Sequence, residues 1–177
     1  MSILPILLHP DARLKKVCKP IASVDAEIQA LADNMLKTMY DAPGIGLAAP
    51  QVGVLKRILV MDCAGREDED PNPTVVINPE IVWSSEEESV YNEGCLSLPE
   101  LYEDVIRPAE VRVQFLDQTG KEREEHYKGL WATCVQHEID HLNGKLFIDH
   151  LSRMKRSMLT KKMIKYKKDL LKEEVDG

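Results

Sequence analysis

The sequence contains a short segment suited to binding a metal ion, His137-Glu138-Ile139-Asp140-His141. On a helix, residues four positions apart project from one face, so the imidazoles of His137 and His141 can bind a single cation. Glu138 would lie beside that ion as a proton acceptor. The alternative is that both histidines only satisfy hydrogen bonds in the core. The pattern therefore predicts a metal centre on a helix but leaves a structural role open.

A third ligand is needed, because a catalytic divalent ion takes three protein ligands and keeps an open position for water. Asp149 and His150 lie downstream of the helix, but Asn143-Gly144 interrupts the chain before them. Cys95 is the stronger candidate. It lies in Glu93-Gly94-Cys95-Leu96-Ser97-Leu98-Pro99, where glycine allows a close turn and proline ends the segment. We expect a loop that presents the Cys95 thiol to a fixed target.

The segment Gly44-Ile45-Gly46-Leu47-Ala48-Ala49-Pro50-Gln51 combines small residues with one amide side chain. Its glycines permit close approach of the backbone to a neighbour, and Gln51 can donate a hydrogen bond. Taken alone, the pattern favours a tight turn that enters a strand. Its functional meaning depends on the other two segments.

Hydrophobic periodicity predicts the elements that position these segments. Apolar residues recur at helical spacing from Asp25 to Tyr40, from Gly129 to Leu142 and, more loosely, from about Met154 to Leu171. Short apolar or alternating runs predict strands at Ile58–Met61, Val75–Ile77, Val111–Phe115 and Glu122–Tyr127. We expect an α+β fold, with mainly antiparallel sheets around the central H-E-x-x-H helix, an N-terminal helix and a C-terminal helix.

Length and composition agree with one globular domain over residues 1–177, because 177 residues with 44% hydrophobic content can bury a core. The four cysteines form no C-x-x-C pair, so reduced thiols are expected. The apolar opening segment lacks a basic leader and contains Pro5, and no apolar run approaches the roughly 20 residues that cross a bilayer. We expect a cytoplasmic protein with no membrane partner.

The net charge of −7 is unevenly distributed along the chain. Residues 151–172 contain nine Lys and Arg against one acid, whereas the rest of the chain contains 14 basic and 29 acidic residues. A basic C-terminal helix and tail, residues 151–177, is either a solvated face or a surface for the phosphates of RNA.

The three segments together resemble the three motifs of the peptide deformylases, in the same order and at similar separations. The resemblance extends from His9-Pro10-Asp11 to Leu146-Phe147-Ile148-Asp149, which is most of the chain. The Glu-Gly-Cys-Leu-Ser form with a long terminal helix is similar to the type common in Gram-negative bacteria. The resemblance implies a metal-dependent amidase that hydrolyses the N-formyl group of formylmethionine on newly made polypeptides and releases formate. A zincin-type metallo-endopeptidase is the alternative.

The resemblance also implies roles for individual residues. The metal ligands would be Cys95, His137 and His141. Glu138 would be the acid and base, and Gln51 with the Leu96 backbone N–H would polarise the formyl carbonyl. Glu93 would pair with Arg107 to brace the Cys95 loop. The residues expected around the substrate are Gly44, Ile45, Gly46, Tyr91, Glu93, Gly94, Arg107, Leu130, Thr133 and Cys134.

The implied cofactor is one divalent ion, Fe2+ in the cell, with Zn2+ or Ni2+ as substitutes in prepared protein. The implied partners are N-formylmethionyl peptides and, through the basic C-terminal helix, the ribosome. DNA is not an expected partner.

Overall fold

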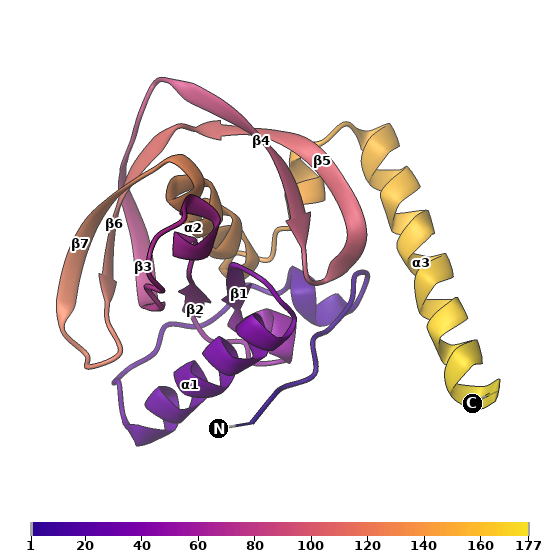
Figure 1. Cartoon of the computed structure of the whole chain (residues 1–177), viewed down its shortest axis with the longest axis horizontal. Coiled ribbons are helices and arrows are strands. Elements are labelled where there is room, and N and C mark those ends of the chain that lie inside the picture. Colours follow the sequence, from indigo (N-terminus) through magenta and orange to yellow (C-terminus); the bar gives the residue numbers. More distant parts are fainter. Residues whose placement is uncertain (1, 177) are drawn as a thin grey trace.

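Two antiparallel sheets surround one buried helix in the computed structural model, which describes residues 2–176 (Figure 1). One sheet has five strands in the order β1-β2-β3-β6-β7, and β4 with β5 forms a second sheet. The strands are β1 (Gly46–Ala48), β2 (Ile58–Met61), β3 (Thr74–Ser84), β4 (Glu88–Cys95), β5 (Leu98–Pro108), β6 (Glu110–Leu116) and β7 (Glu122–Lys128). The helices are η1 (Ala12–Lys15), α1 (Ala26–Asp41), η2 (Ala49–Val52), η3 (Ala64–Glu67), α2 (Gly129–Leu142), η4 (Phe147–His150) and α3 (Arg153–Asp176). The predicted α+β fold is confirmed.

Helix α1 begins where predicted because Asp25 caps it, its side chain accepting a hydrogen bond from the Ile28 N–H at 3.0 Å. The apolar face of α1 is buried against the five-stranded sheet through residues that include Ile28, Ala32, Met35 and Met39. The helix thereby fixes the sheet that contains β1 and β2.

Strand β3 is much longer than the predicted run Val75–Ile77. Asn78 and Pro79 end the apolar run, but irregular pairing with β6 between Ile77 and Glu80 accommodates them. The Asn78 side chain bonds the backbone N–H and carbonyl of Ile21, each at 2.8 Å, which supports its positive φ of 51°. The strand then continues to Ser84.

The segment around Cys95 is not the loop that the sequence predicted but the end of a β-hairpin. Strands β4 and β5 pair from Glu88 with Pro108 to Cys95 with Leu98, and the register shifts between Gly94 and Cys95. A Cβ atom at Gly94 would lie 2.5 Å from the Tyr102 ring, so the strand has no room for a side chain there. Paired backbone therefore holds the Cys95 thiol at the tip of the hairpin.

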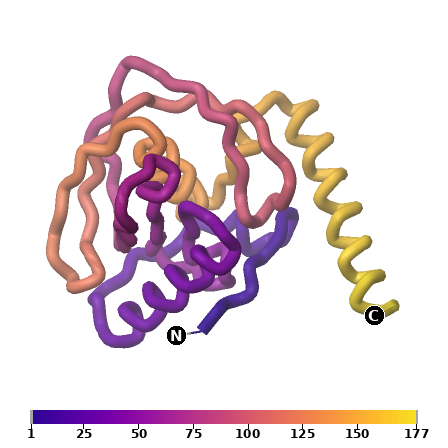
Figure 2. Tube along the Cα trace, viewed as in Figure 1, coloured from indigo at the N-terminus to yellow at the C-terminus, as the bar shows by residue number. Residues whose placement is uncertain are grey.

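Helix α2 spans the predicted residues and lies inside the molecule, surrounded by strands of both sheets (Figures 1 and 2). It ends at Asn143, and Gly144 follows with a φ of 76° that favours glycine. The chain then turns back into η4, where the Leu146 N–H donates to the Asp149 carboxylate at 2.9 Å. Residues after the turn thus return to the flank of α2.

Helix α3 extends beyond the predicted end at Leu171 and leaves most of its surface exposed. Only Leu159 and Met163 among its described residues are buried. His9 Nε2 lies 2.9 Å from Thr160 Oγ1 and adds a polar contact to the body. Figure 2 shows the C-terminal end of the helix standing away from the sheets.

Candidate metal centre

One thiol and two imidazoles converge between the β4–β5 hairpin and α2. The possible ligand atoms of Cys95, His137 and His141 all lie within 4.8 Å of one another. Cys95 Sγ and His141 Nε2 are 3.4 Å apart. Within residues 2–176 no other group of three such residues comes together, and neither of the alternative third ligands, Asp149 and His150, belongs to this one. The donor set fits a borderline or soft divalent ion.

The two histidines differ in their surroundings. His137 Nδ1 lies 2.9 Å from Glu93 Oε1, an arrangement that leaves Nε2 free to face an ion. Burial lowers the pKa of His137, but hydrogen bonds with Cys95 and Glu93 outweigh burial and raise that pKa well above its usual value. Burial lowers the pKa of His141 well below its usual value, which favours the neutral form that a ligand requires.

Glu93 and Arg107 form a buried ion pair behind His137, which agrees with the predicted pairing. Arg107 donates from Nε to Glu93 Oε2 at 2.7 Å and from Nη2 to Glu93 Oε1 at 3.0 Å. Burial raises the pKa of Glu93, yet the hydrogen bonds from His137 and Arg107 outweigh it and lower that pKa to about 2. The carboxylate is therefore ionised and can orient the imidazole.

The Glu138 carboxyl is buried beside the ligands. One oxygen lies 3.6 Å from His137 Nε2, and the other is buried without a hydrogen-bond partner. Burial raises the pKa of Glu138 to about 7. A carboxyl with this pKa can accept a proton and return it near neutral pH.

Gln51 points its amide nitrogen toward the same site. Its Oε1 accepts from the Ala48 N–H at 2.9 Å, which fixes the orientation of the amide. Its Nε2 then lies 3.4 Å from Cys95 Sγ and 3.1 Å from Ser97 Oγ. Leu96 follows Cys95 in the turn between β4 and β5. Both predicted donors are thus next to the thiol.

The glycines of the first motif allow close packing around the site. A Cβ atom at Gly46 would lie 2.8 Å from Cys134 Sγ and 3.0 Å from Glu138 Cδ, so β1 packs directly on α2. A Cβ atom at Gly44 would lie 2.8 Å from a methyl carbon of Leu96. Both glycines therefore contact residues that belong to the candidate centre.

The other residues predicted around the substrate lie on the same elements. Cys134 Sγ is 3.6 Å from the Ile45 carbonyl oxygen, and the Thr133 hydroxyl is buried without a partner. Leu130 is half-buried at the start of α2. Tyr91 Oη lies 3.8 Å from where a Cβ of Gly129 would be, beside Leu130.

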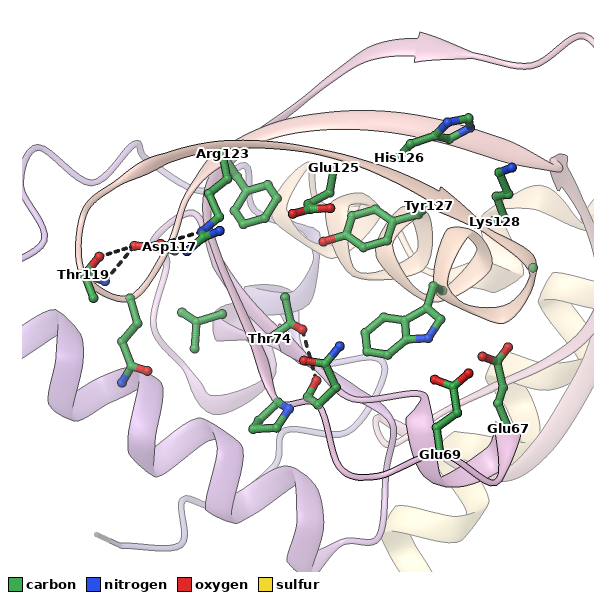
Figure 3. Close-up of a pocket in the computed structure, with 17 residues that line it drawn as sticks. Glu67, Glu69, Thr74, Asp117, Thr119, Arg123, Glu125, His126, Tyr127 and Lys128 are labelled. Carbon is green, nitrogen blue, oxygen red and sulfur yellow. Dashed lines mark hydrogen bonds and ion pairs between the residues drawn. The ribbon is translucent and has the colours of Figure 1, made fainter.

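A cavity of about 840 Å³ lies elsewhere, between β7 and the segment that follows η3 (Figure 3). In Figure 3, Glu125 and Tyr127 face Glu67 and Glu69 across it. None of its lining residues is a predicted ligand or substrate residue. We therefore assign the chemistry to the buried convergence of ligands and not to this cavity.

Sequence reasoning considered His150 only as a possible metal ligand, and it missed both Asp140 and His150 as contacts of the Arg107 network. Arg107 Nη1 donates to Asp140 Oδ2 at 2.8 Å, and His150 Nε2 lies 2.8 Å from the same oxygen. Asp140 lies three residues after His137 in the H-E-x-x-H segment, which is about one helical turn. This spacing was the available signal that the two residues lie close together. No pattern in the sequence joins His150 to Arg107.

Comparisons with known proteins identify the family of the chain. The family model described as polypeptide deformylase matches residues 3–157. The chain is 59% identical over 169 residues to a peptide deformylase of Mesorhizobium japonicum, and the match covers 96% of each chain. It is 57% identical over 167 residues to a peptide deformylase of Methylocella silvestris, and that match covers 93% of this chain and 85% of the relative. A crystal structure of a Legionella pneumophila peptide deformylase superimposes with a TM-score of 0.88 at 47% identity, covering 96% of this chain and 98% of that one. One from Ehrlichia chaffeensis gives 0.91 at 42% identity, covering 96% and 99%. The chain therefore belongs to the polypeptide deformylase family.

Proposed function

We propose that this chain removes the N-formyl group of formylmethionyl peptides with a metal ion held by Cys95, His137 and His141. Members of the family remove this group from nascent peptides, and the comparisons give the endopeptidase alternative no support. The observation that carries the assignment is the convergence of one thiol and two imidazoles within 4.8 Å, beside a buried carboxyl.

The residues at the site fit a divalent ion. A thiolate and two imidazoles match the preferences of Fe2+, Ni2+ and Zn2+, and we propose Fe2+ as the physiological ion on the strength of the family resemblance. When bound, the ion supplies a Lewis acid that lowers the pKa of water toward about 7 and polarises a carbonyl. The orientation of His137 by Glu93 prepares the site for that ion.

Glu138 moves the protons in this mechanism. With a pKa of about 7, its carboxylate takes a proton from the water that attacks the formyl carbon. The carboxyl then gives that proton to the methionine nitrogen, and the bond between this nitrogen and the formyl carbon breaks. The products are formate and a free amino terminus.

Gln51 and Leu96 stabilise the charge that develops on the formyl oxygen. The Gln51 amide nitrogen already points to the site because Ala48 holds the amide oxygen. The Leu96 backbone N–H supplies a second donor from the hairpin turn. Loss of one such donor costs about 3 kcal/mol of transition-state stabilisation.

Selectivity for the formyl group follows from the lack of space around the site. A formyl carbon bears only hydrogen, so a cramped site would admit it while bulkier acyl groups would clash. The close packing of Gly46 on Cys134 and Glu138 beside the site is consistent with such a site. We propose that the methionine side chain binds among apolar side chains that include Ile45, Tyr91, Leu130 and Cys134.

Hydrolysis of formyl-Met-Ala-Ser by protein purified without oxygen tests the function. We expect formate release that a chelator abolishes and that added Fe2+ restores. Cys95→Ala should lose both metal and activity, whereas a zincin endopeptidase would keep both. Metal-loaded protein that releases no formate would refute the proposal.

We further propose that the enzyme works in the cytoplasm and contacts the ribosome through α3. The helix presents basic side chains that suit the phosphates of RNA, among them the exposed Lys155, Lys161, Lys162 and Lys165 and the half-buried Arg156. None of the helices in residues 2–176 combines the length and apolar character needed to cross a bilayer.

The ribosome contact is tested by Lys161→Glu with Lys162→Glu and Lys165→Glu. Binding to ribosomes should weaken by at least tenfold and the wild-type affinity should fall steeply with salt, because phosphate contacts release counterions. Turnover of formyl-Met-Ala-Ser should be unchanged. Equal ribosome affinity of the variant and the wild type would rule out this role of α3.

A further inference from the structure

A continuous set of polar contacts runs from the candidate metal centre to the protein surface. His137 contacts Glu93, which is held by two donors of Arg107. The remaining terminal nitrogen of Arg107 donates to Asp140 at 2.8 Å. Asp140 also lies 2.8 Å from His150 Nε2. Glu93 and Arg107 are buried, Asp140 is 20% exposed at its side chain and His150 is 36% exposed, so the set ends at solvent.

The neighbours of His150 show that its Nε2 atom carries a proton. Its Nε2 lies 2.8 Å from the Asp140 carboxylate and 3.5 Å from Arg107 Nη1, which is itself a donor. The shorter contact requires a proton on Nε2, since two acceptors would repel each other. Asp140 Oδ2 therefore accepts from both Arg107 and His150.

We propose that His150 is a positioning residue of the metal centre, acting through Asp140, Arg107 and Glu93 on the ring of His137. Without the second donor, the partly exposed Asp140 carboxylate is free to turn to water. Arg107 Nη1 then loses its hydrogen-bond partner, and the planar guanidinium group is no longer held in one orientation against Glu93. Because Glu93 fixes the His137 ring, the ligand geometry loosens.

The place of His150 in the fold gives this proposal a second support. His150 ends η4, and the same short helix contains Phe147, whose ring stacks on His137 at 6.0 Å between centroids and 22° between planes. Gly144 brings η4 back to α2, and a Cβ there would lie 2.5 Å from the Lys15 carbonyl oxygen. Thus η4 reaches His137 directly through Phe147 and indirectly through His150.

The inference rests on the proposed metal centre and is tested with Co2+-loaded protein. We compare His150→Phe, which removes the donor, with His150→Gln, which keeps an N–H for Asp140. Outer contacts of metal ligands change metal affinity by about 10- to 100-fold, and we expect the lower end here. Transfer of Co2+ to a chelator should be about tenfold faster in His150→Phe and nearly restored in His150→Gln. The visible absorption of bound Co2+ should change in the first variant only.

His126→Phe is the matched control, because His126 Nε2 also lies 2.9 Å from a carboxylate oxygen, Glu110 Oε1, with 35% of its side chain exposed. It should leave Co2+ release unchanged. A wild-type rate of Co2+ release from His150→Phe would overturn the proposal. A lower melting temperature of metal-free His150→Phe without faster Co2+ release would also overturn it, because that result marks a merely structural contact. Failure of the wild type to bind Co2+ with a sulfur-to-metal absorption band would instead refute the metal centre.

Discussion

The Glu138 carboxyl has lost the solvent that normally keeps a glutamate ionised at neutral pH. Burial raises its pKa to about 7, and one of its oxygens has no protein partner. Such an oxygen is available to a water molecule or a substrate nitrogen. The energetic cost of burying the carboxyl is thus linked to its proposed use in proton transfer.

Glu138→Gln keeps the shape of the side chain but cannot accept a proton. We expect kcat for formyl-Met-Ala-Ser to fall by about 10²- to 10⁴-fold, the usual contribution of a general acid–base group. Metal content, measured in parallel, should remain that of the wild type. Undiminished turnover would show that another group moves the proton.

At this scale the sequence predicts the residues that carry chemistry better than the residues that support them. His137, Glu138 and His141 follow from helical spacing, and Cys95 follows from its turn-forming neighbours. The sequence suggested His150 only as a metal ligand. Its contact with Asp140 and Arg107 could not be predicted, because that contact depends on how η4 folds back after Gly144.

Strand β1 and helix α2 approach each other at Gly46. A methyl group there would lie 2.8 Å from Cys134 Sγ and 3.0 Å from two Glu138 carbons. The contact joins the first motif to the third.

Gly46→Ala should force β1 and α2 apart. We expect the free energy of unfolding to fall by about 1–3 kcal/mol, the usual cost of overpacking, and kcat to fall because Glu138 is displaced. Gly65→Ala is the control, since a Cβ at Gly65 meets nothing within 4 Å. Wild-type stability and turnover in Gly46→Ala would contradict the close packing.

The contact between the N-terminal segment and α3 includes a buried histidine, His9, whose Nε2 lies 2.9 Å from Thr160 Oγ1. Burial, followed by the charge of Lys15, lowers the pKa of His9 from 6.5 to about 4. Between these values the unfolded chain binds more protons than the folded one, so stability falls as pH falls from 6.5 toward 4. We expect His9 to contribute about 2 kcal/mol to the loss of unfolding free energy between pH 7 and pH 5. In urea titrations the unfolding free energy of His9→Gln should fall less than that of the wild type between pH 7 and pH 5. An equal fall would show that His9 does not titrate in this way.

Most elements follow from local patterns, but the β4–β5 hairpin does not. Helices α1 and α2 and strand β2 match their predicted ranges closely because each buries a regular apolar pattern. The hairpin forms a sheet of only two strands, with polar residues such as Asn92 and Asp104 paired across it at 3.1 Å. Strand signals based on apolar alternation are weak in such a segment.

The proposed metal ligands join two parts of the molecule that are distant in sequence. Cys95 comes from the hairpin, and His137 with His141 comes from the central helix. A bound ion therefore connects the two-stranded sheet to the core and should stabilise the whole fold by linkage.

Removal of the metal should lower the melting temperature. An ion present at about a thousand times its dissociation constant contributes about 4 kcal/mol, which corresponds to roughly 10 °C for a chain of this size. Calorimetry with and without chelator measures the shift. Cys95→Ala should melt at the same temperature in both conditions, and a wild type insensitive to chelator would argue against a tightly bound ion.

The order of the ligands along the chain also constrains how the protein matures. During synthesis Cys95 leaves the ribosome more than forty residues ahead of His137. For that interval the thiol has neither imidazole beside it, and oxidants can reach it. If Cys95, His137 and His141 bind the proposed ion, it can be captured only after α2 has emerged and docked, so cofactor loading would be a late event in the biogenesis of this chain.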